Sequence, residues 1–187
     1  MAIKAIILDV YGVLITNAAD IAFDQLGGDH SKYGEEIKNL YRAYDLGYLT
    51  FEEEHSQIAQ MLGVSYQEWV EVMQSATHYN KPLIDYLNDL PLKRAIMSNI
   101  GQESLADMKQ GLDLSKIDEM IISSEVGFVK PDPRIYQVAL ERLGVEPVDC
   151  LFVDDSQINV DGALQLGLQA VLYTNNSELR KSIQNLL

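Results

Sequence analysis

The sequence predicts an α/β protein: a three-layer, Rossmann-like core built on a parallel sheet, with a small helical cap inserted into it. Short runs rich in Ile, Val and Leu alternate with helical patterns in the second half of the chain, which is typical of a parallel sheet covered on both faces. About eighty residues separate the first two runs, far more than one crossover helix needs. The 187 residues suit one core with an insertion rather than two unrelated domains.

The core elements can be placed individually. Glycines that follow two helical patterns, Gly144 and Gly167, are expected to end those helices. The predicted helices are 133–143 and 160–166, and the predicted strands are 3–8, 94–97, 120–122, 151–153 and 170–173.

The insertion reads as helical. A helix is expected over 32–45, and Thr50 with Glu53 three residues later has the spacing of a capping box at the start of the next helix. Ser65 and Glu68 repeat that spacing. We therefore assign residues 1–16 and 92–187 to the core and 17–91 to the cap.

The amino-acid composition limits which binding partners and which cellular compartment are expected. Twenty-eight acidic and fourteen basic residues give a net charge of −14, which argues against nucleic acid and anionic membranes as partners. The apolar run at the N-terminus is too short to cross a bilayer. The single cysteine, Cys150, has no internal disulfide partner, so a cytoplasmic location is expected. A monomer and a homodimer are both compatible with this composition.

Polar side chains follow the predicted strands where ligands bind to open α/β sheets, beyond the carboxyl ends. They are Asp9, Ser98, Asn99, Lys130, Asp154 and Asp155. Asp9 and Asp155 can hold a hard cation through oxygen atoms while one Asp9 oxygen attacks phosphorus. The Ser98 hydroxyl can bind phosphoryl oxygens, and Lys130 supplies positive charge to them. This set predicts a site for phosphoryl transfer.

Four segments in order resemble the motifs of haloacid dehalogenase-like hydrolases. They are DVYGV at 9–13, SN at 98–99, VKPDPRIY at 129–136 and VDDSQINVDGA at 153–163. Together they span nearly the whole core, so they are far more specific than any one of them. The insertion after the first motif also resembles the helical cap of one large subgroup.

The resemblance implies a role for each matching residue. Asp9 would be the nucleophile that forms an aspartyl-phosphate, Ser98 would bind the transferring group, Asn99 would position the loop, and Lys130 would stabilise charge. Mg²⁺ would be held by Asp9, Asp155 and the backbone carbonyl of Tyr11, with Asp154 as a direct ligand or a support. Asn159 is expected to hydrogen-bond within the fourth motif. The substrate would be a small phosphorylated molecule.

Tyr11 departs from the family's usual phosphatase pattern, which has a second aspartate there as general acid and base. A tyrosine with an ordinary pKa near 10 is a poor base at neutral pH. Tyrosine at this position also occurs in metal-independent 2-haloacid dehalogenases, for which Arg42 could bind the substrate carboxylate. Val13 and the Asp154–Asp155 pair argue against that alternative. A non-catalytic module that binds a phosphorylated ligand is the remaining alternative.

Overall fold

The computed structural model describes residues 2–101, 103–104, 108 and 111–187. Its centre is a five-stranded sheet in which every neighbouring pair is parallel, in the order β3-β2-β1-β4-β5. The strands are β1 (Ala5–Leu8), β2 (Lys93–Ser98), β3 (Glu119–Ile122), β4 (Cys150–Asp154) and β5 (Gln169–Leu172). All five predicted strands are confirmed, with shifts of one or two residues at their ends.

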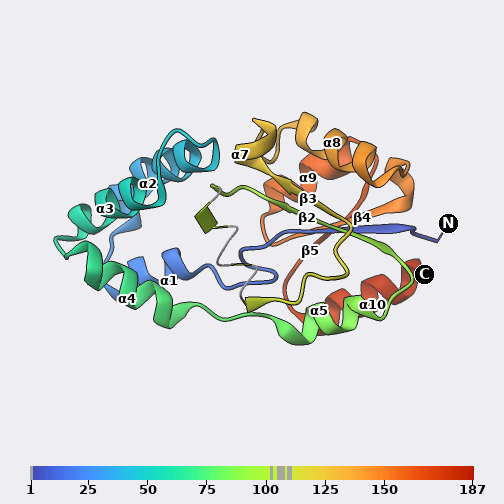
Figure 1. The fold of residues 1–187 in the computed structure, drawn as a ribbon, viewed down its shortest axis with the longest axis horizontal. Coiled ribbons are helices and arrows are strands. Elements are labelled where there is room, and N and C mark those ends of the chain that lie inside the picture. Colours follow the sequence, from blue (N-terminus) through green and yellow to red (C-terminus); the bar gives the residue numbers. More distant parts are fainter. Residues whose placement is uncertain (1, 102, 105–107, 109–110) are drawn as a thin grey trace.

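Both faces of the sheet are covered, as Figure 1 shows. Side chains alternate along β1, so that Ile6 and Leu8 pack in one apolar cluster while Ala5 and Ile7 pack in the other. The first cluster includes side chains of α5 (Lys81–Asn88) and α10 (Asn176–Leu186). The second includes side chains of α8 (Pro133–Leu143) and α9 (Gln157–Gln165). The predicted three-layer α/β fold is therefore confirmed.

Four helices form a separate group beside the sheet (Figure 1). They are α1 (Ala18–Gln25), α2 (His30–Asp45), α3 (Phe51–Leu62) and α4 (Tyr66–Ala76). Phe23 and the fully buried Trp69 lie in their own apolar cluster. Thr50 and Glu53 form the predicted capping box at the start of α3, and the Ser65 hydroxyl accepts a hydrogen bond from the Glu68 N–H. Helix α1, which begins without a side-chain cap, was not predicted from the sequence.

The two segments that join this helical group to the sheet are hydrogen-bonded to each other. Thr16 Oγ1 donates to the Ala76 carbonyl at 2.7 Å and accepts from the His78 N–H at 3.0 Å. Helix α5, within the 17–91 range assigned to the cap, instead packs its side chains on the sheet. The division into core and cap remains a proposal, and these contacts favour ending the cap near Thr77.

Short elements connect the rest. Helix α7 (Ser123–Val126) follows β3, and a 3-10 turn (Pro147–Asp149) precedes β4. The Ser123 hydroxyl donates to the Asp45 carbonyl at 2.6 Å, which ties the end of α2 to the core. Among the described residues, no helix combines the length and the apolar character that crossing a membrane requires.

Candidate active site

A buried lysine joins the ends of β1 and β4. The Nζ atom of Lys130 lies 2.7 Å from Asp9 Oδ1 and 2.6 Å from Asp154 Oδ2. Asp9 follows β1, Asp154 ends β4, and Lys130 precedes α8, so three segments far apart in sequence meet here. All three residues are buried. One ammonium group thus compensates two carboxylates that would otherwise repel each other.

The two oxygens of Asp9 have different surroundings. Oδ1 accepts a hydrogen bond from the Val10 N–H at 2.7 Å in addition to its contact with Lys130. Oδ2 accepts none from the described residues, so its lone pairs are available to a metal or a substrate. Burial raises the pKa of Asp9 to about 7; the Lys130 cation lowers it and the Asp154 carboxylate raises it further. A bound cation would lower that pKa and keep the nucleophile ionised.

Asp154 and Asp155 are adjacent in sequence but differ in their contacts. Both oxygens of Asp154 are engaged: Oδ2 by Lys130, and Oδ1 by the Ser156 N–H at 2.9 Å and Asn159 Nδ2 at 3.0 Å. The contact from Asn159 confirms the hydrogen bond expected within this motif. Asp155 is exposed and lines the cavity described below. This difference favours Asp155 as a direct metal ligand and Asp154 as the residue that positions Lys130.

The carboxylates fit a hard divalent cation. Asp9, Asp154 and Asp155 each offer one oxygen, and these oxygens lie within 4.8 Å of one another. Carboxylate oxygens are the ligands that Mg²⁺ prefers. The Tyr11 carbonyl stays a proposed ligand. The donor set therefore suits the predicted ion, and Asp9 and Asp155 would hold it.

Gly12 permits this arrangement, because its backbone has φ +81° and a Cβ atom there would lie 1.9 Å from Asp155 Oδ2. We expect Gly12→Ala to displace Asp155 and to raise the Mg²⁺ concentration for half-maximal activity about tenfold or more. Gly144→Ala is the matched control, since Gly144 also has a positive φ but meets only the Lys93 Nζ atom, at 3.9 Å. A similar Mg²⁺ requirement in both variants would contradict a metal role for Asp155.

Ser98 and Asn99 lie at the end of β2. The Ser98 hydroxyl is buried and has no hydrogen-bond partner among the described residues, although the residue lines the cavity. A buried hydroxyl without a partner is costly, and a phosphoryl oxygen would supply one. Asn99 Nδ2 donates to the Lys130 carbonyl at 3.2 Å, and Asn99 Oδ1 accepts from the Lys130 N–H at 2.8 Å. Asn99 therefore positions the Lys130 loop.

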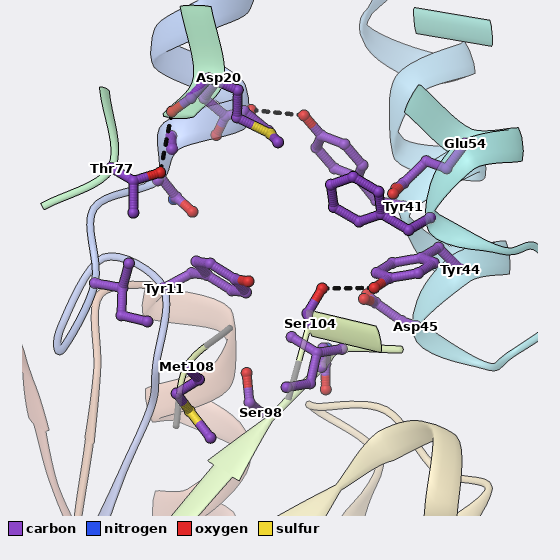
Figure 2. Close-up of a pocket in the computed structure, with 18 of the residues that line it drawn as sticks. Tyr11, Asp20, Tyr41, Tyr44, Asp45, Glu54, Thr77, Ser98, Ser104 and Met108 are labelled. Atoms are coloured by element: carbon purple, nitrogen blue, oxygen red, sulfur yellow. Dashed lines mark hydrogen bonds between the residues drawn. The ribbon is translucent and has the colours of Figure 1, made fainter. Parts of the chain in front are cut away.

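These residues face a cavity of about 700 Å³ between the sheet and the cap. Figure 2 shows Tyr41, Tyr44 and Glu54 across the cavity from Tyr11 and Ser98. Helix α2 contributes Tyr41, Tyr44 and Asp45 to the lining, as expected for positions i, i+3 and i+4 of one helical face.

The structure does not bring Arg42 to this cavity. Its side chain is exposed, and Arg42 is not among the residues that line the cavity. The physical reason is the helical period, which turns position 42 away from the face shared by Tyr41, Tyr44 and Asp45. The expectation that Arg42 binds a substrate carboxylate therefore has no support in the structure.

Three acidic residues that line the cap side of the cavity were not predicted from the sequence: Asp20, Asp45 and Glu54. Burial raises the pKa of Asp45 to about 8, while Lys130 lowers it and Asp9 raises it. Burial, and then the charge of Asp45, raise the pKa of Glu54 to about 8. The four-residue spacing of Tyr41 and Asp45, which puts both on one helical face, was the one sequence feature that could have indicated Asp45. Nothing beyond its place in a predicted helix indicated Glu54.

Glu54 should make stability depend on pH. The pKa of a free glutamate side chain is 4.5, and that of Glu54 in the folded protein is about 8, so between these values only the folded form holds the proton. The contribution of Glu54 to stability is then greatest below pH 4.5 and falls as pH rises towards 8. Asp45 acts in the same direction, whereas His55, whose pKa burial lowers to about 4, acts oppositely and only below 6.5.

Between about pH 6.5 and 8.5 the unfolding free energy of the wild type should fall by about 1–2 kcal/mol more than that of the Glu54→Gln protein. Chemical denaturation at several pH values measures this difference. Glu52→Gln, an exposed change on the same helix, should follow the wild type. Parallel curves for wild type and Glu54→Gln would mean that Glu54 is already ionised at the lower end of this range.

Comparison with known proteins decides the family. A family model described as haloacid dehalogenase-like hydrolase matches residues 3–167. The chain belongs to this family of hydrolases. The match includes all four motifs and the helical insertion between the first and the second.

Relatives of this haloacid dehalogenase-like hydrolase carry more than one activity in their names. A (S)-2-haloacid dehalogenase of Pseudomonas sp. (strain CBS-3) is 25% identical over 90% of this chain and 83% of its own length. A phosphatase of Mycobacterium tuberculosis is 32% identical over 55% of this chain and 48% of its own length. The chain spans less than half the length of the first few curated relatives that it matches.

Solved structures share the fold. A HAD family enzyme from Bacteroides thetaiotaomicron, in complex with magnesium and inorganic phosphate, is 22% identical, with a TM-score of 0.74 over 95% of this chain and 98% of that chain. A predicted HAD-like hydrolase from Porphyromonas gingivalis is 22% identical, with a TM-score of 0.76 over 100% of this chain and 98% of that chain.

Proposed function

We propose that this hydrolase is a Mg²⁺-dependent phosphatase that cleaves a small phosphate monoester through an aspartyl-phosphate on Asp9. The observation that carries the proposal is the group of three carboxylates, Asp9, Asp154 and Asp155, with oxygens within 4.8 Å of one another. A metal-independent enzyme would have no need for this concentration of negative charge. The related enzyme that was crystallised with magnesium and inorganic phosphate supports the same choice.

The chain's own residues can supply the nucleophile and the stabilisation of charge for both half-reactions. Asp9 Oδ2 attacks phosphorus, and the bond to the leaving oxygen breaks as the aspartyl-phosphate forms. Lys130 and the Ser98 hydroxyl stabilise the charge on the phosphoryl oxygens. Water then attacks the same phosphorus, which releases phosphate and restores the Asp9 carboxylate. Bound Mg²⁺ would supply additional positive charge for the phosphoryl group.

Protonation of the leaving oxygen is the step for which the usual aspartate is missing. Tyr11 occupies that position and lines the cavity. An activated leaving group such as p-nitrophenolate needs no such proton. A poorly activated alcohol must receive a proton from water, from the substrate or from the cap side of the cavity.

A metal-independent 2-haloacid dehalogenase is the second candidate, because relatives with that name match most of the chain. The cavity weighs against it. A 2-haloacid carries a carboxylate, yet no arginine is found among the described residues that line the cavity. The acidic residues of the cap side offer that carboxylate no positive charge.

The test compares two reactions in one protein. We expect p-nitrophenyl phosphate to be hydrolysed with Mg²⁺ and not with EDTA, and 2-chloropropionate to release no chloride under either condition. Chloride release that EDTA does not reduce would replace the phosphatase by the dehalogenase. Binding of inorganic phosphate without turnover of either compound would instead favour a non-catalytic module.

A further inference from the structure

The cap side of the cavity carries three carboxyl groups, and no described lysine or arginine there pairs with them. Asp20, Asp45 and Glu54 come from three different helices, α1, α2 and α3. Among the described lining residues, the one lysine is Lys130 and none is an arginine. Lys130 contacts Asp9 and Asp154, so its charge lies at the opposite end of the cavity and is already paired.

Glu54 is the most deeply buried member of this group. It is 2% exposed, and its carboxylate accepts no hydrogen bond from the described part of the chain. Nδ1 of His55 lies 3.4 Å from Glu54 Oε2 but forms no hydrogen bond with any described residue. Burial lowers the pKa of His55 to about 4, so its ring is neutral and offers no counter-charge. Two adjacent polar groups at the wall of the cavity therefore lack partners among these residues.

Aromatic side chains complete this wall. Tyr41, Tyr44 and Phe51 line the cavity beside the carboxylates. The Phe51 ring packs edge-on against Tyr44, with centroids 6.2 Å apart, and against His55, with centroids 3.9 Å apart. Carboxylates set among aromatic rings are the chemistry that recognises ammonium groups, through charge pairing and cation–π attraction. A carboxylate or a second phosphate would find no positive side chain to pair with among the described residues of this wall.

The acidic wall and the phosphoryl site belong to one cavity, because Asp45 and Glu54 line it together with Asp9. The pKa of Asp45 responds to the charges of Lys130 and Asp9, and the pKa of Glu54 responds to Asp45. Figure 2 shows Asp45 and Glu54 on the same side of the cavity, opposite Tyr11. Asp45 therefore interacts electrostatically both with the reacting end of the cavity and with Glu54.

We propose that this wall, formed by Asp20, Asp45 and Glu54 with Tyr41, Tyr44 and Phe51, binds the ammonium group of the substrate, which makes the substrate class the phosphate monoesters of amino alcohols. This inference rests on the proposed phosphatase function, because it places the phosphate of the same molecule at Asp9. Burial favours the protonated forms of Glu54 and Asp45 in the unliganded protein, and the bound ammonium group supplies the positive charge that stabilises their ionised forms.

Calorimetric binding to the Asp9→Asn protein with Mg²⁺ tests the inference without turnover. The probes are 2-aminoethyl phosphate and propyl phosphate, which have nearly the same size and differ by an ammonium in place of a methyl group. We expect the ammonium compound to bind about tenfold tighter or more. We choose binding rather than the reaction rate as the readout, because the ammonium group also makes the alcohol a better leaving group and would raise the rate without any contact to the wall.

Glu54→Gln in the same background should reduce that preference about threefold or more, whereas Glu52→Gln, exposed on the same helix, should retain it. Equal affinity for the two probes, tighter binding of propyl phosphate, no binding of either, or a preference unaffected by both Glu54→Gln and Asp45→Asn would overturn the inference. Hydrolysis of p-nitrophenyl phosphate by the wild type, measured in parallel, tests the phosphatase separately. Turnover without a preference for the ammonium compound would overturn the ammonium site and leave the phosphatase proposal standing.

Discussion

Asp9→Asn is expected to reduce Mg²⁺-dependent hydrolysis of p-nitrophenyl phosphate by roughly 10³-fold or more, because the substitution removes the attacking oxygen's charge. The fold should survive, since asparagine keeps an oxygen that can accept from the Val10 N–H, and Lys130 keeps its contact with Asp154. The melting temperature should therefore stay close to that of the wild type while turnover is lost.

The matched control for this variant is Asp85→Asn, which makes the same chemical change at an exposed position on α5. It should retain wild-type turnover. If Asp9→Asn retained a tenth of the activity, Asp9 could not be the nucleophile, and the reaction would have to use water directly.

Lys130→Met should have a second large effect, on stability and on activity together. The Lys130 side chain is 2% exposed and contacts two carboxylates, so its removal leaves both without their counter-charge in a buried site. Loss of one partner from a buried ion pair costs about 3–5 kcal/mol. Turnover should also fall by about 10²-fold or more, because charge on the phosphoryl oxygens is no longer compensated. Urea denaturation and phosphate release measure the two effects.

A double variant separates these effects. Adding Asp154→Asn to Lys130→Met removes one stranded charge, and the amide oxygen of the new asparagine can still accept from the Ser156 N–H. About 1 kcal/mol or more of stability should return while activity does not. A Lys130→Met protein as stable as the wild type at about pH 8, where the carboxylates of the unfolded chain are ionised, would show that the buried ion contacts do not contribute as described.

The sheet could be predicted from sequence because parallel strands buried on both faces appear as continuous apolar runs. The predicted 151–153 run lies within β4, and the predicted helix 133–143 coincides with α8. The ends of these strands then located Asp9, Ser98, Lys130 and Asp155, since parallel strands present their carboxyl ends at one edge. The strand pattern was therefore sufficient to predict most of the residues that meet at the reacting end of the site.

The cap side was beyond sequence reasoning because it depends on how separate helices face one another. An acidic residue on a helix is usually solvated, so Glu54 in the run Glu52–Glu54 looked like its exposed neighbours. Its burial depends on tertiary packing: His55 Nδ1 lies 3.4 Å from Glu54 Oε2, and the His55 ring packs against Trp69, with centroids 5.9 Å apart. For the same reason Arg42 was placed at the site, whereas its neighbours Tyr41 and Asp45 line the cavity.

The central claim is that Asp9 carries the phosphoryl group during turnover, and trapping that species tests it most directly. The protein would be mixed with p-nitrophenyl phosphate and Mg²⁺, quenched in acid within the first turnover, digested and examined by mass spectrometry. We expect one added phosphoryl group on the peptide containing Asp9, absent with EDTA and absent from Asp9→Asn. Rapid phosphate release with no phosphorylated peptide at any quench time, or with the phosphoryl group on another residue, would contradict the account.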